Sequence, residues 1–256
     1  MNGAERKTEG GAGSRGVPET GSPDERRGDS RRGRRRRIVG ILLGAGLVAI
    51  GGGYAFRFSL INRLKPAAVT LTESYAAQTA GEHFDHSAWT AVLEEFVTAD
   101  GKVDYAGLMK NTGRLDAYIA SLGNAPFDDL SRDEKLAMLI NAYNACTLRP
   151  VLDYWPISSI WDIPYADRWA AERWRIGSLT LSLQQIENDY LRARFREPRI
   201  HFTINCASVG CPPLRREAYS GNRIEAQLQA QAEVVHGHDR WVRLDGETVY
   251  LTRLYY

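Results

Sequence analysis

The chain has 256 residues, of which 43% are hydrophobic and six are tryptophan, enough for a folded core. Its formal net charge of +2 is uneven: residues 1–37 hold eleven Lys/Arg and six Asp/Glu, and the rest holds 22 basic and 25 acidic residues. The basic excess therefore belongs to the N-terminal tail, and no nucleic-acid partner is expected for the folded part. Three cysteines are too few for a disulfide-rich scaffold and allow one bridge with one free thiol.

The first 83 residues divide into three expected segments. Residues 1–37 are rich in Gly, Arg, Glu and Ser, and they are predicted to be a disordered, cytoplasmic tail because they lack large apolar side chains to bury. Residues 38–56 carry no charge, and as a helix they are long enough to cross the roughly 30 Å of membrane hydrocarbon. Residues 57–83 are expected to be a linker.

The arginines directly before residues 38–56 predict a single-pass signal anchor in the inner (cytoplasmic) membrane. The N-terminus is then inside, and the folded domain is periplasmic or extracellular. A cleaved signal peptide is the alternative, favoured by the glycines at 51–53 and opposed by the lack of a small-residue cleavage site. In either case the membrane is the first expected partner, through residues 38–56.

Residues 84–256 are expected to form one α+β domain, with helices packed on a small, mostly antiparallel sheet. Capping boxes at Ser131 and Ser182 mark the starts of two helices, and Pro150 is expected to kink or split the first of them. Apolar periodicity and turn residues predict helices over 87–97, 108–122, 132–155, 183–195 and 224–235, and hairpins over 174–181 and 241–254.

Two amides lie on the apolar helix that follows Ser131. Asn141 and Asn144 are three residues apart and therefore share a helix face. Buried amides need hydrogen-bond partners, so the pair is expected either to tie down neighbouring loops or to line a site. Cys146, two residues further on, is expected to be a small core side chain.

The segment 199–214, RIHFTINCASVGCPPL, gathers more chemically reactive side chains than any other part of the chain. Its alternating run over 200–204 predicts a strand with its apolar side in a core. His201 lies on this strand, and the loop that follows holds Cys206 and Cys211.

Short motifs of residues 84–256 occur in the order typical of one family. The chain resembles the domain-of-unknown-function 547 family, whose biochemical role is not established. The resemblance implies a fold similar to the papain-like and transglutaminase-like group, and an export signal or membrane anchor. The motifs are His86-Ser87-Ala88-Trp89, Gly101-Lys102-Val103-Asp104-Tyr105, Ile140-Asn141-Ala142-Tyr143-Asn144-Ala145, Tyr154-Trp155-Pro156-Ile157, Leu181-Ser182-Leu183, Ile186-Glu187, Pro198-Arg199-Ile200-His201-Phe202, Asn205-Cys206-Ala207-Ser208 and Cys211-Pro212-Pro213-Leu214.

Two features depart from this family pattern. Many relatives have histidine after the Ile-Glu pair, where this chain has Asn188. If that histidine is a base in relatives, the base is missing here. Relatives also continue beyond the hairpin 241–254, so a C-terminal truncation of this sequence is an open alternative.

A structural or binding role is the first interpretation of the cysteine segment. Cys206 and Cys211 close a six-residue segment, for which a disulfide is chemically reasonable in an oxidising compartment. Neither thiol is then free, and the domain is a binding module for an unknown small molecule or peptide. The candidate ligand-binding residues are Asn144, Asn205, Ser208 and Arg199.

A cysteine-dependent hydrolase or acyl transferase is the alternative. Cys206 would be the nucleophile, His201 the base, and Glu187 or Asn141 the group that orients the base. His201 precedes Cys206 by five residues, up to about 17 Å along an extended strand, so the two meet only if the loop folds back. In a papain-like arrangement the nucleophile also begins a helix, whereas no cysteine here begins a predicted one.

A metal site of His201, Cys206 and Cys211 is the third interpretation. The donor atoms suit zinc, but the spacing matches no zinc-ribbon pattern and a fourth ligand is not evident. We therefore expect no metal and no other cofactor.

Overall fold

The computed structural model describes residues 75, 76, 78 and 80–255. The predicted tail (1–37), the predicted anchor (38–56) and most of the predicted linker (57–83) lie outside these residues. No helix within the described part of the chain is long and apolar enough to cross a membrane.

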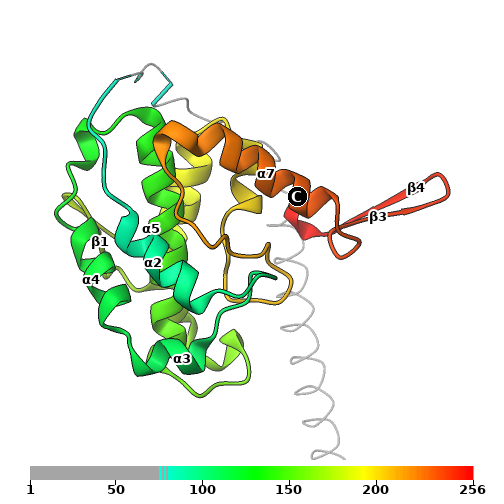
Figure 1. Ribbon diagram of the computed structural model, residues 1–256, viewed down its shortest axis with the longest axis horizontal. Coiled ribbons are helices and arrows are strands. Elements are labelled where there is room, and N and C mark those ends of the chain that lie inside the picture. The colour runs from blue at the N-terminus through cyan, green and yellow to red at the C-terminus, as the bar shows by residue number, and fades with distance from the viewer. Residues whose placement is uncertain (1–74, 77, 79, 256) are drawn as a thin grey trace, which may run out of the picture. The chain divides into compact units, whose positions relative to one another are not determined.

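The described residues form an α+β unit with two small antiparallel sheets, which confirms the predicted class (Figure 1). In this part of the chain the strands make two separate hairpins, β1–β2 and β3–β4, rather than one sheet under the helices. The helices are α2 (Ser87–Phe96), α3 (Tyr105–Lys110), α4 (Gly113–Leu122), α5 (Arg132–Asp153), α6 (Leu183–Gln185) and α7 (Ile224–His236); the π-helices are η3 (Ala166–Ala170) and η4 (Ile186–Arg192). The short 3₁₀ helices are η1 (Phe127–Asp129), η2 (Ile160–Asp162), η5 (Pro198–Phe202), η6 (Gly221–Arg223) and η7 (Arg253–Tyr255), and the strands are β1 (Trp174–Ile176), β2 (Leu179–Leu181), β3 (Val242–Asp245) and β4 (Thr248–Leu251).

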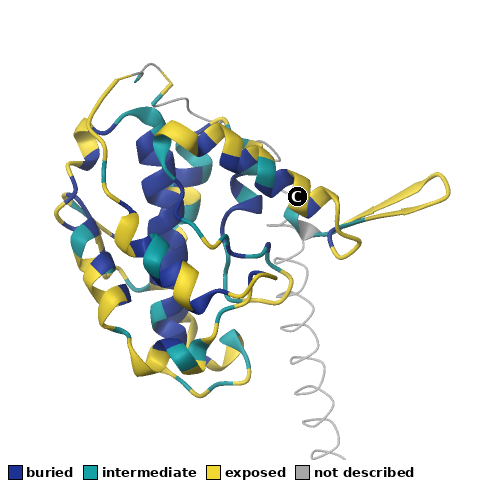
Figure 2. Ribbon diagram, in the orientation of Figure 1, coloured by how far each residue is buried: buried dark blue, intermediate teal, exposed yellow. Residues whose placement is uncertain are grey.

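Helix α5 runs through the middle of this unit and is buried along most of its length (Figure 2). It begins as predicted, because the Ser131 hydroxyl accepts a hydrogen bond from the Glu134 amide at 3.3 Å. Pro150 does not split it, and the helix continues to Asp153. Cys146 is fully buried on it, as predicted, and burial raises the pKa of its thiol.

Of the helices before α5, α4 packs directly on it, and α2 packs on α4 (Figure 1). Helix α2 buries the predicted apolar face, and its Trp89 ring stacks on Tyr118 of α4 with centroids 5.6 Å apart. The predicted helix over 108–122 is two helices instead of one. Asp104 caps α3 by accepting from the Gly107 amide at 2.9 Å, and α3 ends at Lys110, before Asn-Thr-Gly, residues that favour caps and turns over helix interiors.

The strand predicted over 200–204 is wrong: these residues belong to the 3₁₀ helix η5 and the turn after it. Pro198 favours a helical start, and the Glu197 carboxylate accepts from the Arg199 amide at 2.9 Å, which caps the helix. Thr203 ends it, with both its amide and its hydroxyl donating to the Ile200 carbonyl. The apolar side chains of Ile200, Phe202 and Ile204 are buried, as predicted. Thr203 is buried as well, so burial along this segment does not alternate as it would in a strand with one exposed face.

Both predicted hairpins are present. In β3–β4, the pairs Val242–Leu251 and Leu244–Val249 lie on one face of the ribbon. This hairpin projects from the rest of the unit and is exposed over most of its length (Figure 2).

A tight turn after α2 contacts the end of the cysteine segment. The Gly101 carbonyl accepts from the Leu214 amide at 3.2 Å, and Gly101 has a φ of +77°. A Cβ at this position would lie 2.2 Å from the Cβ of Pro213. The turn and the cysteine segment therefore fit together only with glycine at position 101.

This close approach predicts a large loss of stability for Gly101→Ala. The free energy of unfolding of the full chain should fall by about 3 kcal/mol, from the positive φ and the overlap with Pro213 together. Gly246→Ala is the matched control, because Gly246 also has a positive φ but faces open space; it should cost about 1 kcal/mol. Urea unfolding followed by tryptophan fluorescence measures both, and equal losses would contradict the packing described here.

Candidate functional site

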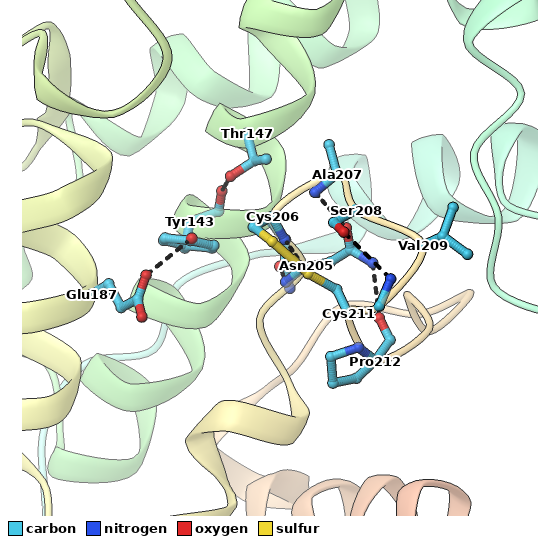
Figure 3. Close-up of a disulfide and its surroundings, with 12 residues drawn as sticks. Tyr143, Thr147, Glu187, Asn205, Cys206, Ala207, Ser208, Val209, Cys211 and Pro212 are labelled. Carbon is cyan, nitrogen blue, oxygen red and sulfur yellow. Dashed lines mark hydrogen bonds between the residues drawn. A yellow bond between two sulfur atoms is a disulfide. The ribbon is translucent and has the colours of Figure 1, made fainter. Parts of the chain in front are cut away.

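The structure brings Cys206 and Cys211 together, as predicted (Figure 3). Their sulfur atoms lie side by side near disulfide distance, and their Cα atoms are 6.4 Å apart, within the range that a disulfide can span. The Cys206 amide also donates to the sulfur of Cys211 at 3.2 Å. We call residues 205–214 the cysteine loop.

Asn205 braces the cysteine loop from within. Its side-chain nitrogen donates to the Pro212 carbonyl at 2.8 Å, and its side-chain oxygen accepts from the Ala207 amide at 2.8 Å. Ala207 has a φ of +57°, a strained conformation for alanine that these contacts help to hold. The Asn205 amide is therefore engaged in the loop itself, whereas Ser208 is exposed at the tip.

The two asparagines of α5 hold the chain on either side of this loop. Asn144 donates to the Thr203 carbonyl at 2.9 Å and accepts from the Asn205 amide at 2.8 Å. Asn141 donates to the Tyr219 carbonyl at 2.8 Å and accepts from the Tyr219 amide at 2.9 Å. Of the two interpretations of this pair, the structure supports the one in which the amides tie down neighbouring segments.

Cys206 also lines a small pocket of about 210 Å³. Across it, the Tyr143 hydroxyl donates to a Glu187 carboxylate oxygen at 3.1 Å (Figure 3). Burial raises the pKa of Tyr143, and the negative charge of Glu187 adds to this effect. The other lining residues are Tyr165, Trp169, Gln184 and Asn188.

His201 is half-buried on η5 and does not line this pocket. Within the described residues no hydrogen bond joins it to Cys206. Burial lowers the pKa of His201, as does the positive charge of Arg192, while Glu187 and the backbone of Leu254 oppose the shift. Because its pKa lies below the usual value, the imidazole is mainly neutral at pH 7 and can accept a proton.

Arg199 is occupied by two carboxylates. Its guanidinium donates to both oxygens of Glu197 and to both oxygens of Glu225, over 2.7–2.9 Å. These charge-assisted hydrogen bonds raise the pKa of Arg199 and fix η5 against α7. These four hydrogen bonds use most of the N–H donors of Arg199, and its ligand-binding role stays a prediction.

A second and larger hollow, of about 780 Å³, lies against the cysteine loop at Asn205, Ser208 and Cys211; we call it the groove. It runs between the loop, the turn at Gly101 and the end of α7. The cysteine loop therefore separates two cavities, with Cys206 at the small pocket and Cys211 at the groove. Within the described residues, no group of three or more His, Cys, Asp or Glu side chains is arranged to hold a metal ion.

Part of the chain matches a known family. Residues 127–234 match the model of the family described as "Protein of unknown function, DUF547". The match supports membership of the DUF547 family. It spans α5, both asparagines and the cysteine pair, so the braced loop lies inside the region that resembles this family. No curated protein and no solved structure matches the chain.

Several residues of these cavities were not singled out from the sequence. Tyr143 was named only as part of a family motif, although the hydroxyl of a buried tyrosine needs a hydrogen-bond partner and could have indicated a polar neighbour. Arg216, Arg240 and Trp241 line the groove from segments that no local pattern connects to the cysteines.

The Asn144 contacts predict a specific loss of stability. Asn144→Ala should lower the free energy of unfolding of the full chain by about 3 kcal/mol, because the Thr203 carbonyl and the Asn205 amide lose their buried partner. The exposed Asn124→Ala should change it by less than about 0.5 kcal/mol. Urea unfolding measures both, and a loss for Asn144→Ala no larger than for the control would show that the loop does not depend on this amide.

Proposed function

We propose that this chain is a membrane-anchored, extracytoplasmic binding module that binds its ligand in the groove. The anchor is residues 38–56, with the N-terminus inside the cell and the folded unit in the periplasm or outside the cell. The ligand is a small molecule or peptide.

The cysteine pair is the observation that carries this proposal. Cys206 and Cys211 lie at near-disulfide distance, and disulfides persist in oxidising compartments and are rare in the cytosol. A bond between them leaves Cys146 as the only thiol, and Cys146 is fully buried. The loop is then a rigid wall of the groove rather than the carrier of a nucleophile.

The size and position of the groove support a binding role. Its volume of about 780 Å³ lies in the range of cavities that hold small ligands. The asparagines of α5 fix the chain before and after the cysteine loop, so this wall needs little ordering when a ligand binds.

A cysteine-dependent hydrolase or acyl transferase is the second candidate. It is favoured by the position of Cys206 in the pocket of Tyr143 and Glu187. This activity requires the reduced pair, with Cys206 as nucleophile and His201 as base. The papain-like or transglutaminase-like fold belongs to this same proposal and stays a prediction.

The proposal can be tested by labelling the full chain in spheroplasts of a bacterial host with a membrane-impermeant maleimide. We expect no labelling before reduction and labelling of Cys206 and Cys211 after treatment with a phosphine reductant. Cys206→Ser is the positive control, because it frees the Cys211 thiol and should be labelled without reductant.

Two results would contradict the proposal in different ways. Labelling of the unreduced wild-type chain would show that the bond is absent and would favour the cysteine-dependent activity. Labelling of Cys206→Ser only after lysis would place the folded unit in the cytoplasm.

A further inference from the structure

Basic side chains outnumber acidic ones in the groove, whereas acidic residues outnumber basic ones over residues 38–256 as a whole. Four Lys/Arg side chains line it against two carboxylates, Asp100 and Glu217. Lys102 pairs with Asp100 at 2.6 Å, and Arg215 pairs with Glu217. Both carboxylates are therefore already neutralised. Over residues 38–256, by contrast, acidic residues outnumber basic ones by 25 to 22.

The other two arginines of the groove, Arg216 and Arg240, have no carboxylate partner among the described residues. One nitrogen of Arg216 donates to the Glu94 carbonyl at 2.6 Å, and one nitrogen of Arg240 donates to the Val209 carbonyl at 2.9 Å. A backbone carbonyl thus positions each guanidinium through one N–H group. The remaining N–H groups form the planar fork that suits a carboxylate.

Two further donors lie in the same groove. The Nδ1 atom of His238 accepts from the Arg240 amide at 3.1 Å, which leaves Nε2 as the donor of the ring. The Ser208 hydroxyl accepts from the Gly210 amide at 3.3 Å and keeps its own proton to donate. The free polar groups of the groove are therefore mainly donors, which favours a ligand rich in acceptors.

Part of the groove wall is apolar. Val209 and Val234 are 78% and 46% exposed, and Leu214 and Trp241 also line the groove. The Trp241 ring is held by its N–H, which donates to the Gly210 carbonyl at 2.9 Å. An inorganic anion would leave these apolar side chains in water, so they favour an anionic ligand with an apolar portion.

We infer that the groove recognises a carboxylate-bearing ligand with an apolar portion. Its carboxylate pairs with Arg216 or Arg240, and its apolar portion lies against Val209 and Val234. This inference rests on the proposed function, because it names the ligand class of the same groove.

A pair of probes that differ only in charge tests this inference. N-acetyl-4-fluorophenylalanine carries a carboxylate, and its amide is neutral. The full chain is kept in an uncharged detergent, and ¹⁹F NMR follows the binding of each probe. The wild type is compared with Arg216→Gln and Arg240→Gln. We expect the carboxylate probe to bind more tightly than the amide, and its affinity to fall about tenfold in at least one arginine variant.

Two controls separate the groove from other sites. Arg243→Gln removes an exposed arginine of the β3–β4 hairpin, which packs over Tyr250 outside the groove, and should leave the affinity unchanged. Ser208→Trp places a bulky side chain in the groove and should abolish the binding of both probes.

The outcomes distinguish the inference from the proposed function. If Ser208→Trp abolishes binding but the amide binds as well as the carboxylate and neither arginine matters, the groove binds ligands without selecting for charge, and the inference fails alone. If neither probe binds the wild type, or Ser208→Trp leaves binding unchanged, the groove is not the binding site, and the proposed function fails with it.

Discussion

The candidate site depends on two buried amides of one helix. Asn144 and Asn141 each use both side-chain polar atoms to hold the backbone of a segment 59 to 78 residues further along the chain. One of these segments lies at the start of the cysteine loop and the other follows its end. Two side chains of α5 therefore hold the loop at both ends. Because an unpaired buried amide costs about as much as a lost hydrogen bond, the helix and the two segments must order together.

The position of the cysteine pair follows from this constraint. With its ends fixed, the loop turns back on itself and Asn205 binds the carbonyl of Pro212, which places the two sulfur atoms side by side. Cys206 then faces the pocket of Tyr143 and Glu187, and Cys211 faces the groove. The same short segment therefore closes the small pocket on one side and forms a wall of the larger groove, with its excess of basic side chains, on the other.

Local signals predicted much of the fold. The Ser131 cap, the apolar face of α2 and the hairpin over 174–181 each depend on residues within a few positions of one another, and all three were found. The strand predicted over 200–204 was wrong because an alternating apolar sequence does not by itself fix the backbone conformation. Pro198 at the start and the Glu197 cap favour the 3₁₀ helix that forms instead. The partners of the asparagines and the arginines of the groove depend on tertiary packing, and no short-range pattern contains that information.

Hydrogen exchange at single amides tests the central role of the asparagines most directly. The amide protons of Asn205 and Tyr219 donate to the buried oxygens of Asn144 and Asn141, so in the full chain they should exchange only through global unfolding, as slowly as the amides inside α5. The exposed Val209 amide in the same loop should exchange far faster. Exchange of Asn205 and Tyr219 at the rate of Val209 would show that α5 does not hold the cysteine loop and would contradict this account.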